Sequence, residues 1–295
     1  MNNLEDLNTS SENILEKIDN NLDCFSKTHR KIAVYILENY DKAVFQTSSQ
    51  LAKLCDVSES SVIRFANAID YDGYSDMQKE LQNFLKEKIT VTQRLESISE
   101  NTSDEMEILY NVLQKSVSDI NWLIHNINEN TFSKVVELLS NSKRVYLSGS
   151  RSSYSVTYFL GLGLKWIRDD VFVLDGINRD FDMLSKIEPD DVLLSVSLPR
   201  YLNTTLEVHE YAYKKGAQTI CITDTITSPL VKFSTVPLLI NNELLSFSDN
   251  LIPVMCVVTG ILNSVAAKNS GSKDKIKHLE TFWNELGIYQ KYNNL

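Results

Sequence analysis

The stretch VYLSGSRSSYS, Val145 to Ser155, joins a short apolar run to a single glycine and a series of hydroxyl side chains. A buried strand, Gly149 and a helix that begins at hydroxyl residues together are typical of a phosphate-binding turn. Free backbone N–H groups and the positive end of the helix dipole meet in such a turn. A polar helix start without a ligand would carry the same serines, because serine and threonine are also good N-caps.

The chain around this stretch alternates between short apolar runs and helical patterns. The predicted strands cover residues 144–148, 171–174, 191–197, 218–223 and 236–240, and the main predicted helices cover 156–167, 204–215 and 248–267. Short apolar strands that alternate with helices predict a mainly parallel α/β sheet with helices on both faces. Ligands of such folds bind at the carboxyl ends of the strands.

Hydroxyl side chains follow three of the predicted strands, at 150–153, 195–197 and 223–228. Arg151 and Arg200 add positive charge to the first two of these segments, and an arginine can pair with a phosphate or a carboxylate through two hydrogen bonds. The sequence therefore favours an anionic ligand at this edge of the sheet.

The N-terminal third contains TSSQLAKLCDVSESSVIRFANAI, Thr47 to Ile69. Thr47 and Gln50 form the pattern of a capping box, and Ser58 is a good N-cap for a second helix after a tight break. The side chains expected to face inward are Leu51, Leu54, Val62, Phe65 and Ile69. Two short helices joined by a tight turn are typical of a helix-turn-helix, although bundles that never bind DNA contain such pairs as well.

If this segment binds DNA, its second helix reads the bases. The expected contacts on that helix are Ser58, Ser60, Ser61, Arg64 and Asn67, since arginine can pair with guanine and asparagine with adenine. Thr47, Ser48 and Lys53 on the first helix could hold phosphates. Residues 24–88 carry as many acidic as basic side chains, so we expect a homodimer or a higher homo-oligomer to be needed for useful affinity.

The bulk composition is that of an ordinary globular protein. The chain has 295 residues, a net charge of −10 and 43% hydrophobic residues. Four scattered cysteines give no support for a zinc or redox site, so neither a metal nor a cofactor is expected. The polar, acidic N-terminus is not a signal peptide, and the most apolar run, 251–262, is too short for a membrane span. We therefore expect a cytoplasmic protein without a membrane partner.

Residues 106–127 predict one amphipathic connector helix. The apolar positions recur every three or four residues: Met106, Leu109, Leu113, Val117, Ile120, Ile124 and Ile127. The helix could pack on the following domain, or it could dimerise or transmit motion. The polar residues 86–103 before it are expected to include a linker.

Two resemblances bear on these alternatives. Residues 51–81, LAKLCDVSESSVIRFANAIDYDGYSDMQKEL, resemble the N-terminal domain of RpiR-type transcriptional regulators. GSRSSY and SVSLPRYLNTT resemble the two ligand loops of the sugar isomerase (SIS) domain, which binds phosphosugars and forms the effector half of these regulators. The resemblance implies effector contacts from Ser150, Ser152 and Ser153 in the first loop and from Ser195, Ser197 and Thr204 in the second.

A sugar-phosphate isomerase needs a positioned base, and none of the four histidines falls in the hydroxyl segments. The acidic residues that could reach the site, Asp175, Asp180, Asp182, Glu243 and Asp249, are more simply solvated loop residues. The sequence thus predicts a regulator and not an enzyme: a helix-turn-helix domain at 1–85, a linker and connector helix at 86–128, and an SIS domain at 129–295. The alternatives are an isomerase-like enzyme with an appended helical domain, and an interaction module with a vestigial sugar pocket.

Overall fold

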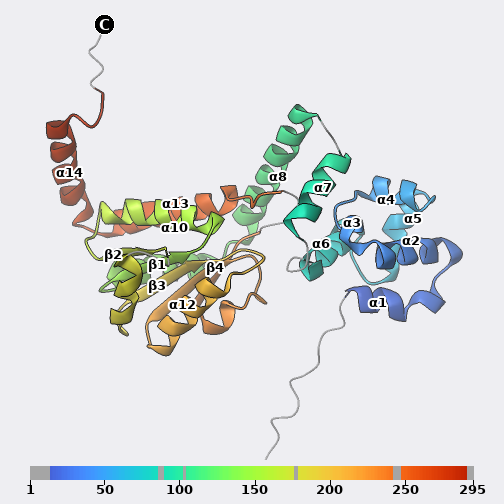
Figure 1. Cartoon of the computed structure of the whole chain (residues 1–295), viewed down its shortest axis with the longest axis horizontal. Helices are drawn as coiled ribbons and strands as arrows, with labels where there is room; N and C mark the ends of the chain where they lie inside the picture. The colour runs from blue at the N-terminus through green and yellow to red at the C-terminus, as the bar shows by residue number, and fades with distance from the viewer. Residues whose placement is uncertain (1–13, 86–89, 102–103, 176–178, 242–246, 291–295) are drawn as a thin grey trace, which may run out of the picture. The chain divides into compact units, whose positions relative to one another are not determined.

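The computed structural model describes residues 14–85, 90–101, 104–175, 179–241 and 247–290 (Figure 1). The chain divides into two compact units, and the division between them falls after Ile108. Each unit has its own hydrophobic core and is described by itself.

The first unit is helical. Its elements are α1 (Ile14–Asn20), the 3-10 turn η1 (Leu22–Cys24), α2 (Lys27–Glu38), α3 (Tyr40–Ala43), α4 (Ser48–Leu54), α5 (Glu59–Ala68), α6 (Tyr74–Leu85) and α7 (Val91–Asn101). On α1, α2, α5 and α6 the core side chains recur at helical spacing, so that each of these helices turns one apolar stripe inward. The stripe predicted for α5 is confirmed, since Val62, Phe65 and Ile69 are all buried.

Helices α4 and α5 form the predicted pair with a tight turn between them. The capping box is present: the Thr47 hydroxyl accepts from the Gln50 backbone N–H, and the Gln50 side chain accepts from the Thr47 N–H. Asp56 has φ 53°, in the left-handed region that aspartate tolerates better than most residues. This residue reverses the chain within one turn and lets α5 start after Ser58.

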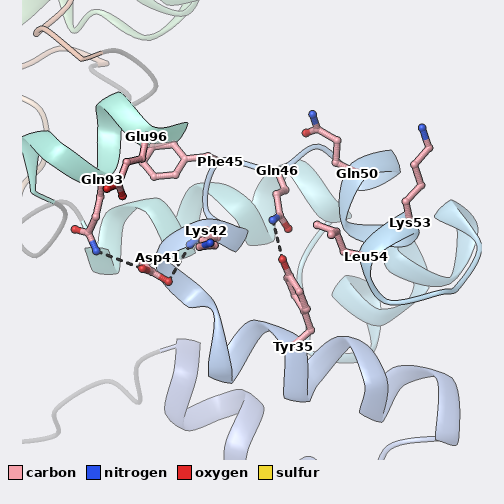
Figure 2. A pocket seen from close by; sticks show the side chains of 10 residues that line it. All are labelled: Tyr35, Asp41, Lys42, Phe45, Gln46, Gln50, Lys53, Leu54, Gln93 and Glu96. Carbon is pink, nitrogen blue, oxygen red and sulfur yellow. Dashed lines mark hydrogen bonds between the residues drawn. The ribbon is translucent and has the colours of Figure 1, made fainter. Parts of the chain in front are cut away.

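One expectation for this unit is wrong, and the segment expected to include the linker contains a helix. Leu54 is 55% exposed and does not face the core; it lines a cavity of about 400 Å³, where the Gln46 amide donates to the Tyr35 hydroxyl over 2.8 Å (Figure 2). The predicted linker contains α7, whose Gln93 amide donates to the Asp41 carboxylate at 3.3 Å in the same view. This contact ties α7, which spans Val91–Asn101, to α3.

The second unit is an α/β structure. Its helices are α8 (Glu105–Asn126, which starts just before the division), α9 (Glu129–Asn141), α10 (Ser152–Lys165), α11 (Arg179–Asp182), α12 (Asn203–Lys214), α13 (Ile252–Lys268) and α14 (Ser272–Leu286), with 3-10 turns η2 (Met183–Lys186) and η3 (Val231–Phe233). Its strands are β1 (Val145–Gly149), β2 (Val171–Leu174), β3 (Val192–Val196), β4 (Gln218–Thr223) and β5 (Val236–Leu239).

The five strands form one sheet in the order β2-β1-β3-β4-β5, and every neighbouring pair is parallel. The predicted strands are confirmed, and the sheet is wholly rather than mainly parallel. Helices α10 and α13 cover one face and α12 covers the other (Figure 1). Alternate residues of a strand serve the two faces: Leu147 packs with α10 and α13, whereas Tyr146 packs on the α12 side. Helix α13 begins at Ile252, later than predicted, with Pro253 in its first turn.

Helix α8 confirms the predicted connector helix, but it packs through a different face. Ser116, Asp119 and Leu123 are its buried residues. Five of the seven predicted stripe residues are exposed, namely Met106, Leu109, Leu113, Val117 and Ile124. Most of the stripe therefore does not pack on the α/β unit, although Ile127 at its end packs against the core of that unit.

Helix α14 was not predicted. It follows α13 at a bend of 104° and points away from the sheet (Figure 1). Its Trp283 ring contacts Trp166 of α10 edge-on, with ring centroids 5.6 Å apart. In the described residues, no single helix is long and apolar enough to cross a membrane, and α13 and α14 meet that test only as a bent pair.

Candidate functional site

The two predicted ligand loops meet at the carboxyl edge of the sheet. Ser150 follows β1, and its hydroxyl is hydrogen-bonded to Thr205 at 3.0 Å and to Thr204 at 3.3 Å. Strands β1 and β3 are neighbours in the sheet, so their carboxyl ends bring these segments together although some fifty residues separate them in sequence. The N-terminus of α12 therefore lies beside the loop that leads into α10.

A cavity of about 660 Å³ opens next to this junction, on the α12 side of the sheet. A volume of this size suits a small-molecule ligand. The cavity is lined by Ser148, Ser150, Leu174, Phe181, Asp182, Leu184, Ser185, Thr204, Glu207, Val208 and Tyr211. Two predicted contact residues, Ser150 and Thr204, thus reach the cavity, together with hydroxyl groups and carboxylates from η2, α11 and α12.

Arg151 and Arg200 share an unusual backbone conformation. Their φ angles are 55° and 68°, in the region that favours glycine. Arg151 combines this φ with ψ −124° and immediately precedes α10. Both side chains are exposed, and within the described part of the chain neither guanidinium has a hydrogen-bond or ion-pair partner. Both charges are therefore available to an anion at the two loops.

Ser152, the first residue of α10, does not point to open space. Its hydroxyl donates to the Asp249 carboxylate at 2.5 Å. Asp249 lies two residues before the residue that caps α13 and is half-buried. The simpler interpretation of Asp249 as a solvated loop residue is therefore wrong: it contacts the first ligand loop.

Three other predicted contacts lie deeper in the protein. Ser195 is fully buried, and its hydroxyl is hydrogen-bonded to Nδ1 of His209 at 2.8 Å, while Nε2 of the same ring is hydrogen-bonded to Ser234 at 2.8 Å. Burial lowers the pKa of His209 from 6.5 to about 4, so the ring is neutral at physiological pH. Ser153 and Ser197 are buried as well and do not line the cavity.

Sequence reasoning missed several cavity residues. Ser148 is the neighbour of Ser195 in the β1–β3 register, so strand alternation places both on the α12 face and could have identified it. Glu207 and Tyr211 are four residues apart and share a face of α12 with Thr204. Asp182, interpreted from the sequence as a solvated residue, lines the cavity. Asp180 and Glu243 lie outside the residues whose side chains the structure describes.

The third hydroxyl-rich segment does not reach the cavity. Thr225 and Thr227 are hydrogen-bonded to each other at 3.2 Å, and Ser228 is buried. The two threonine hydroxyls serve the loop itself, as turn residues commonly do, whereas the Ser228 hydroxyl has no hydrogen-bond partner among the described residues.

The candidate DNA-binding face is the exposed side of α5. Ser60, Arg64 and Asn67 are exposed, and the Arg64 guanidinium donates to the Ser60 carbonyl at 3.2 Å. Ser58 occupies the N-cap position, but its hydroxyl contacts the hydroxyls of Ser60 and Ser61 at 2.9 and 2.8 Å and caps no backbone N–H. The helix therefore presents three neighbouring hydroxyls and one arginine at its first two turns.

The predicted phosphate contacts lie on the adjoining α4. Lys53 is exposed, and Thr47 is engaged in the capping box. The Ser48 hydroxyl donates to the Glu59 carboxylate at 2.5 Å, which joins the start of α4 to the start of α5. The eight predicted DNA contacts thus come from two adjacent helices of one unit.

The cysteines give the site no chemistry. Cys24 and Cys256 are exposed, Cys55 and Cys221 are buried, and none of the four forms a disulfide. Burial raises the pKa of both buried thiols to about 11, so they stay protonated. The described residues contain no cluster of His, Cys, Asp and Glu that could hold a metal ion.

Comparison with known proteins supports both halves. Residues 12–88 match the helix-turn-helix domain of the rpiR family, and residues 138–260 match the SIS domain. An uncharacterised HTH-type transcriptional regulator of Caldanaerobacter subterraneus is 25% identical over 274 residues, which cover 92% of this chain and 95% of the relative. The HTH-type transcriptional regulator HexR of Escherichia coli is 24% identical over 229 residues and 76% of each chain.

The solved structure of Vibrio vulnificus NanR, a complex with ManNAc-6P, has a similar fold. It superposes with a TM-score of 0.56 at 23% identity and covers 93% of this chain and 99% of that one. The two domains occur in the order of the RpiR-type architecture, so the chain belongs to the rpiR family of helix-turn-helix transcriptional regulators.

Proposed function

We propose that this protein is a sequence-specific DNA-binding transcriptional regulator whose C-terminal domain senses a phosphorylated sugar. The observation that carries the proposal is the junction of the two SIS loops, where Ser150 meets Thr204 and Thr205 beside a cavity of about 660 Å³, in a chain that also holds an rpiR-type helix-turn-helix.

The junction divides into two chemically different parts. Arg151, Arg200 and the helix N-termini of α10 and α12 supply positive potential and donors at the loops, where a phosphate group would bind. The cavity beyond them carries carboxylates from Asp182 and Glu207, which accept hydrogen bonds from sugar hydroxyls. A phosphorylated sugar fits both parts, with its phosphate at the positive loops and its hydroxyls at the carboxylates of the cavity. NanR, the structural relative, is complexed with such a sugar.

The first unit supplies the DNA contact. We assign DNA binding to residues 1–85, the connector to 86–128 and effector binding to 129–295. Because one copy offers few cations on α4 and α5, a homodimer that presents two copies of α5 would bind an operator with two half-sites. Binding to chromosomal DNA would require the cytoplasmic location predicted from the sequence.

The DNA assignment is tested by fluorescence anisotropy with the DNA upstream of the protein's own gene. Arg64→Ala should weaken binding about five- to 150-fold, since one bidentate base contact contributes about 1–3 kcal/mol. Lys134→Ala removes a positive charge from an exposed position on α9 and should leave binding unchanged. Equal binding by wild type and Arg64→Ala would show that α5 does not read the DNA.

The effector assignment is tested by isothermal titration of the full chain with hexose, pentose and N-acetylhexosamine phosphates. Ser150→Ala should weaken binding of the phosphosugar that the wild type binds. Ser155→Ala is the matched control, because that exposed hydroxyl donates only to the Ser152 carbonyl of its own helix. Equal losses in both variants, or undiminished binding by Ser150→Ala, would contradict the assignment.

A sugar-phosphate isomerase is the second candidate, and one observation favours it. Glu207 and Asp182 place carboxylates in the cavity wall, where either could move a proton between adjacent sugar carbons. Proton exchange from the sugar phosphates into D₂O, followed by NMR, separates the candidates. Exchange that disappears in Glu207→Gln would establish an enzyme, and binding without exchange would support a sensor.

A further inference from the structure

Asp249 accepts a hydrogen bond from the Ser152 hydroxyl, a group of the first ligand loop that could otherwise bind the effector's phosphate. The Ser152 hydroxyl, at the first residue of α10, donates to Asp249 Oδ2 at 2.5 Å. A hydroxyl has one proton to donate, so Ser152 cannot donate to a phosphate oxygen while it donates to this carboxylate.

Their negative charges also keep the Asp249 carboxylate and a phosphate group from being at the same loop together. A sugar phosphate carries about −1.5 to −2 charges at neutral pH. Asp249 and such a group at the same loop would repel each other, because like charges a few ångströms apart in a partly buried site interact strongly. Entry of the phosphate therefore favours a conformation in which Asp249 has left Ser152.

The residue after Asp249 contacts the connector helix. The Asn250 amide donates to Asp119 Oδ2 and to the Ser116 hydroxyl, each at 3.3 Å. Asp119 is fully buried and is held by Lys115 at 2.5 Å and by Asn241 at 2.9 Å. Asn250 therefore binds a fixed group on α8 and not a mobile surface side chain.

Displacement of Asp249 consequently acts on α8. Asp249 and Asn250 are covalent neighbours, so a shift of the first strains hydrogen bonds of 3.3 Å that are already long. Helix α8 contains the division between the two units of the chain, after Ile108. Any change in how α8 is held is thus passed on directly to the chain that enters the DNA-binding unit.

We propose that Asp249 is a built-in competitor for the effector's phosphate and that Asn250 carries its displacement to Asp119 on α8. This inference rests on the proposed function. In the ligand-free state the carboxylate holds the loop and α8 in one arrangement; in the bound state the phosphate takes Ser152 and releases the link. The link gives the effector a differential contact in the two states, which allosteric control requires.

The competitor role is tested with inorganic phosphate as the probe, titrated into the full chain and followed by ³¹P NMR. Asp249→Asn keeps an oxygen that Ser152 can donate to but removes the charge, so phosphate should bind about tenfold more tightly than to wild type. Thermal melting first establishes that the variant is folded. Binding that is unchanged or weaker would overturn the competitor role.

The link to α8 is tested with Asn250→Asp. This variant keeps the oxygen that accepts from the Ile252 N–H, so the start of α13 is retained, but it replaces the donor that faces Asp119. Asn126→Asp is the matched control, because Asn126 is exposed on α8 and donates only to the Trp122 carbonyl of that helix.

The readout is the ratio of DNA affinities with and without the sugar phosphate, with N-acetylmannosamine 6-phosphate and hexose 6-phosphates as probes. Wild type and Asn126→Asp should show the same ratio. Asn250→Asp should still bind the probe but show a ratio near one. A wild-type ratio in Asn250→Asp would overturn the link while leaving the proposed function intact. A wild type that binds DNA but no probe in either assay would overturn both.

Discussion

Arg151 shows at the scale of one residue how a binding loop departs from the most stable backbone. Its φ of 55° with ψ −124° is a conformation that glycine adopts readily and that costs other residues about 1–3 kcal/mol. Arg200 repeats a positive φ in the second loop. Two strained arginines in the two loops that meet at the cavity suggest that their charge is retained for the ligand and not for the fold.

Arg151→Gly should therefore separate stability from binding. Relief of strain should exceed the extra entropy of glycine in the unfolded chain, about 0.4–1 kcal/mol, so the midpoint of thermal unfolding should rise. Phosphosugar affinity should fall because one cation is lost. Arg151→Ala retains the strain and should lose affinity without the gain in stability. A glycine variant that melts below wild type would show that the Arg151 side chain stabilises the fold.

His209 makes the stability of the second unit depend on pH. Its pKa is lowered to about 4 in the folded protein, so between pH 6.5 and 4 the unfolded chain binds a proton that the folded protein does not. Stability is therefore complete above pH 6.5 and is lost as pH falls toward 4, on the order of 3 kcal/mol in total.

His209→Gln, which can still hydrogen-bond to Ser195 and Ser234, should flatten this dependence. The three tryptophans at 122, 166 and 283 all lie in the second unit, so urea unfolding followed by tryptophan fluorescence reports on that unit alone. A pH slope equal to that of wild type would show that the pKa of His209 does not differ between the folded and the unfolded states.

Among the elements, α8 has an exposed apolar stripe that the described residues of its own unit leave largely uncovered. Tyr110, Leu113, Val117 and Ile124 are exposed, with Ile120 partly exposed between them, and the spacing alternates between three and four residues. This heptad spacing, with no charged residue in the stripe, is typical of a seam between two helices. It supports the predicted homodimer.

Val117→Glu tests the seam. Val117 is 58% exposed, so the change should leave the fold and its melting temperature intact while sedimentation shifts toward a monomer and operator affinity falls. Ser118→Glu places the same charge one residue on, outside the stripe, and should change neither. A dimer that survives Val117→Glu must use another surface.

The sequence predicted those elements whose residues are completely buried. It did not predict contacts between residues that are far apart in the chain. The parallel strands are buried on both faces and therefore read as continuous apolar runs. Helix α7 was missed in a polar stretch, yet Thr90 and Gln93 form the same reciprocal cap as Thr47 and Gln50, so its signal was present. Nothing in the sequence paired Ser195 with His209 or Ser152 with Asp249, because those contacts depend on how α12 and α13 pack on the sheet.

For the whole molecule, the proposed regulator has its two sites in separate compact units. An effector can alter DNA binding only through a coupling free energy between those units. Thermodynamic linkage makes that coupling reciprocal: if the phosphosugar changes operator affinity by some factor, operator DNA must change phosphosugar affinity by the same factor.

We expect the two factors to agree when both are measured at equilibrium, at one salt concentration, with the full chain. Anisotropy gives operator affinity with and without saturating phosphosugar, and calorimetry gives phosphosugar affinity with and without saturating operator. In Arg64→Ala, which should bind the operator more weakly, an operator concentration that saturates the wild type but not this variant should change phosphosugar affinity less than in the wild type. Unequal factors in wild type would mean that DNA and phosphosugar do not act through one shared equilibrium, for example because the phosphosugar also changes the oligomeric state formed through α8.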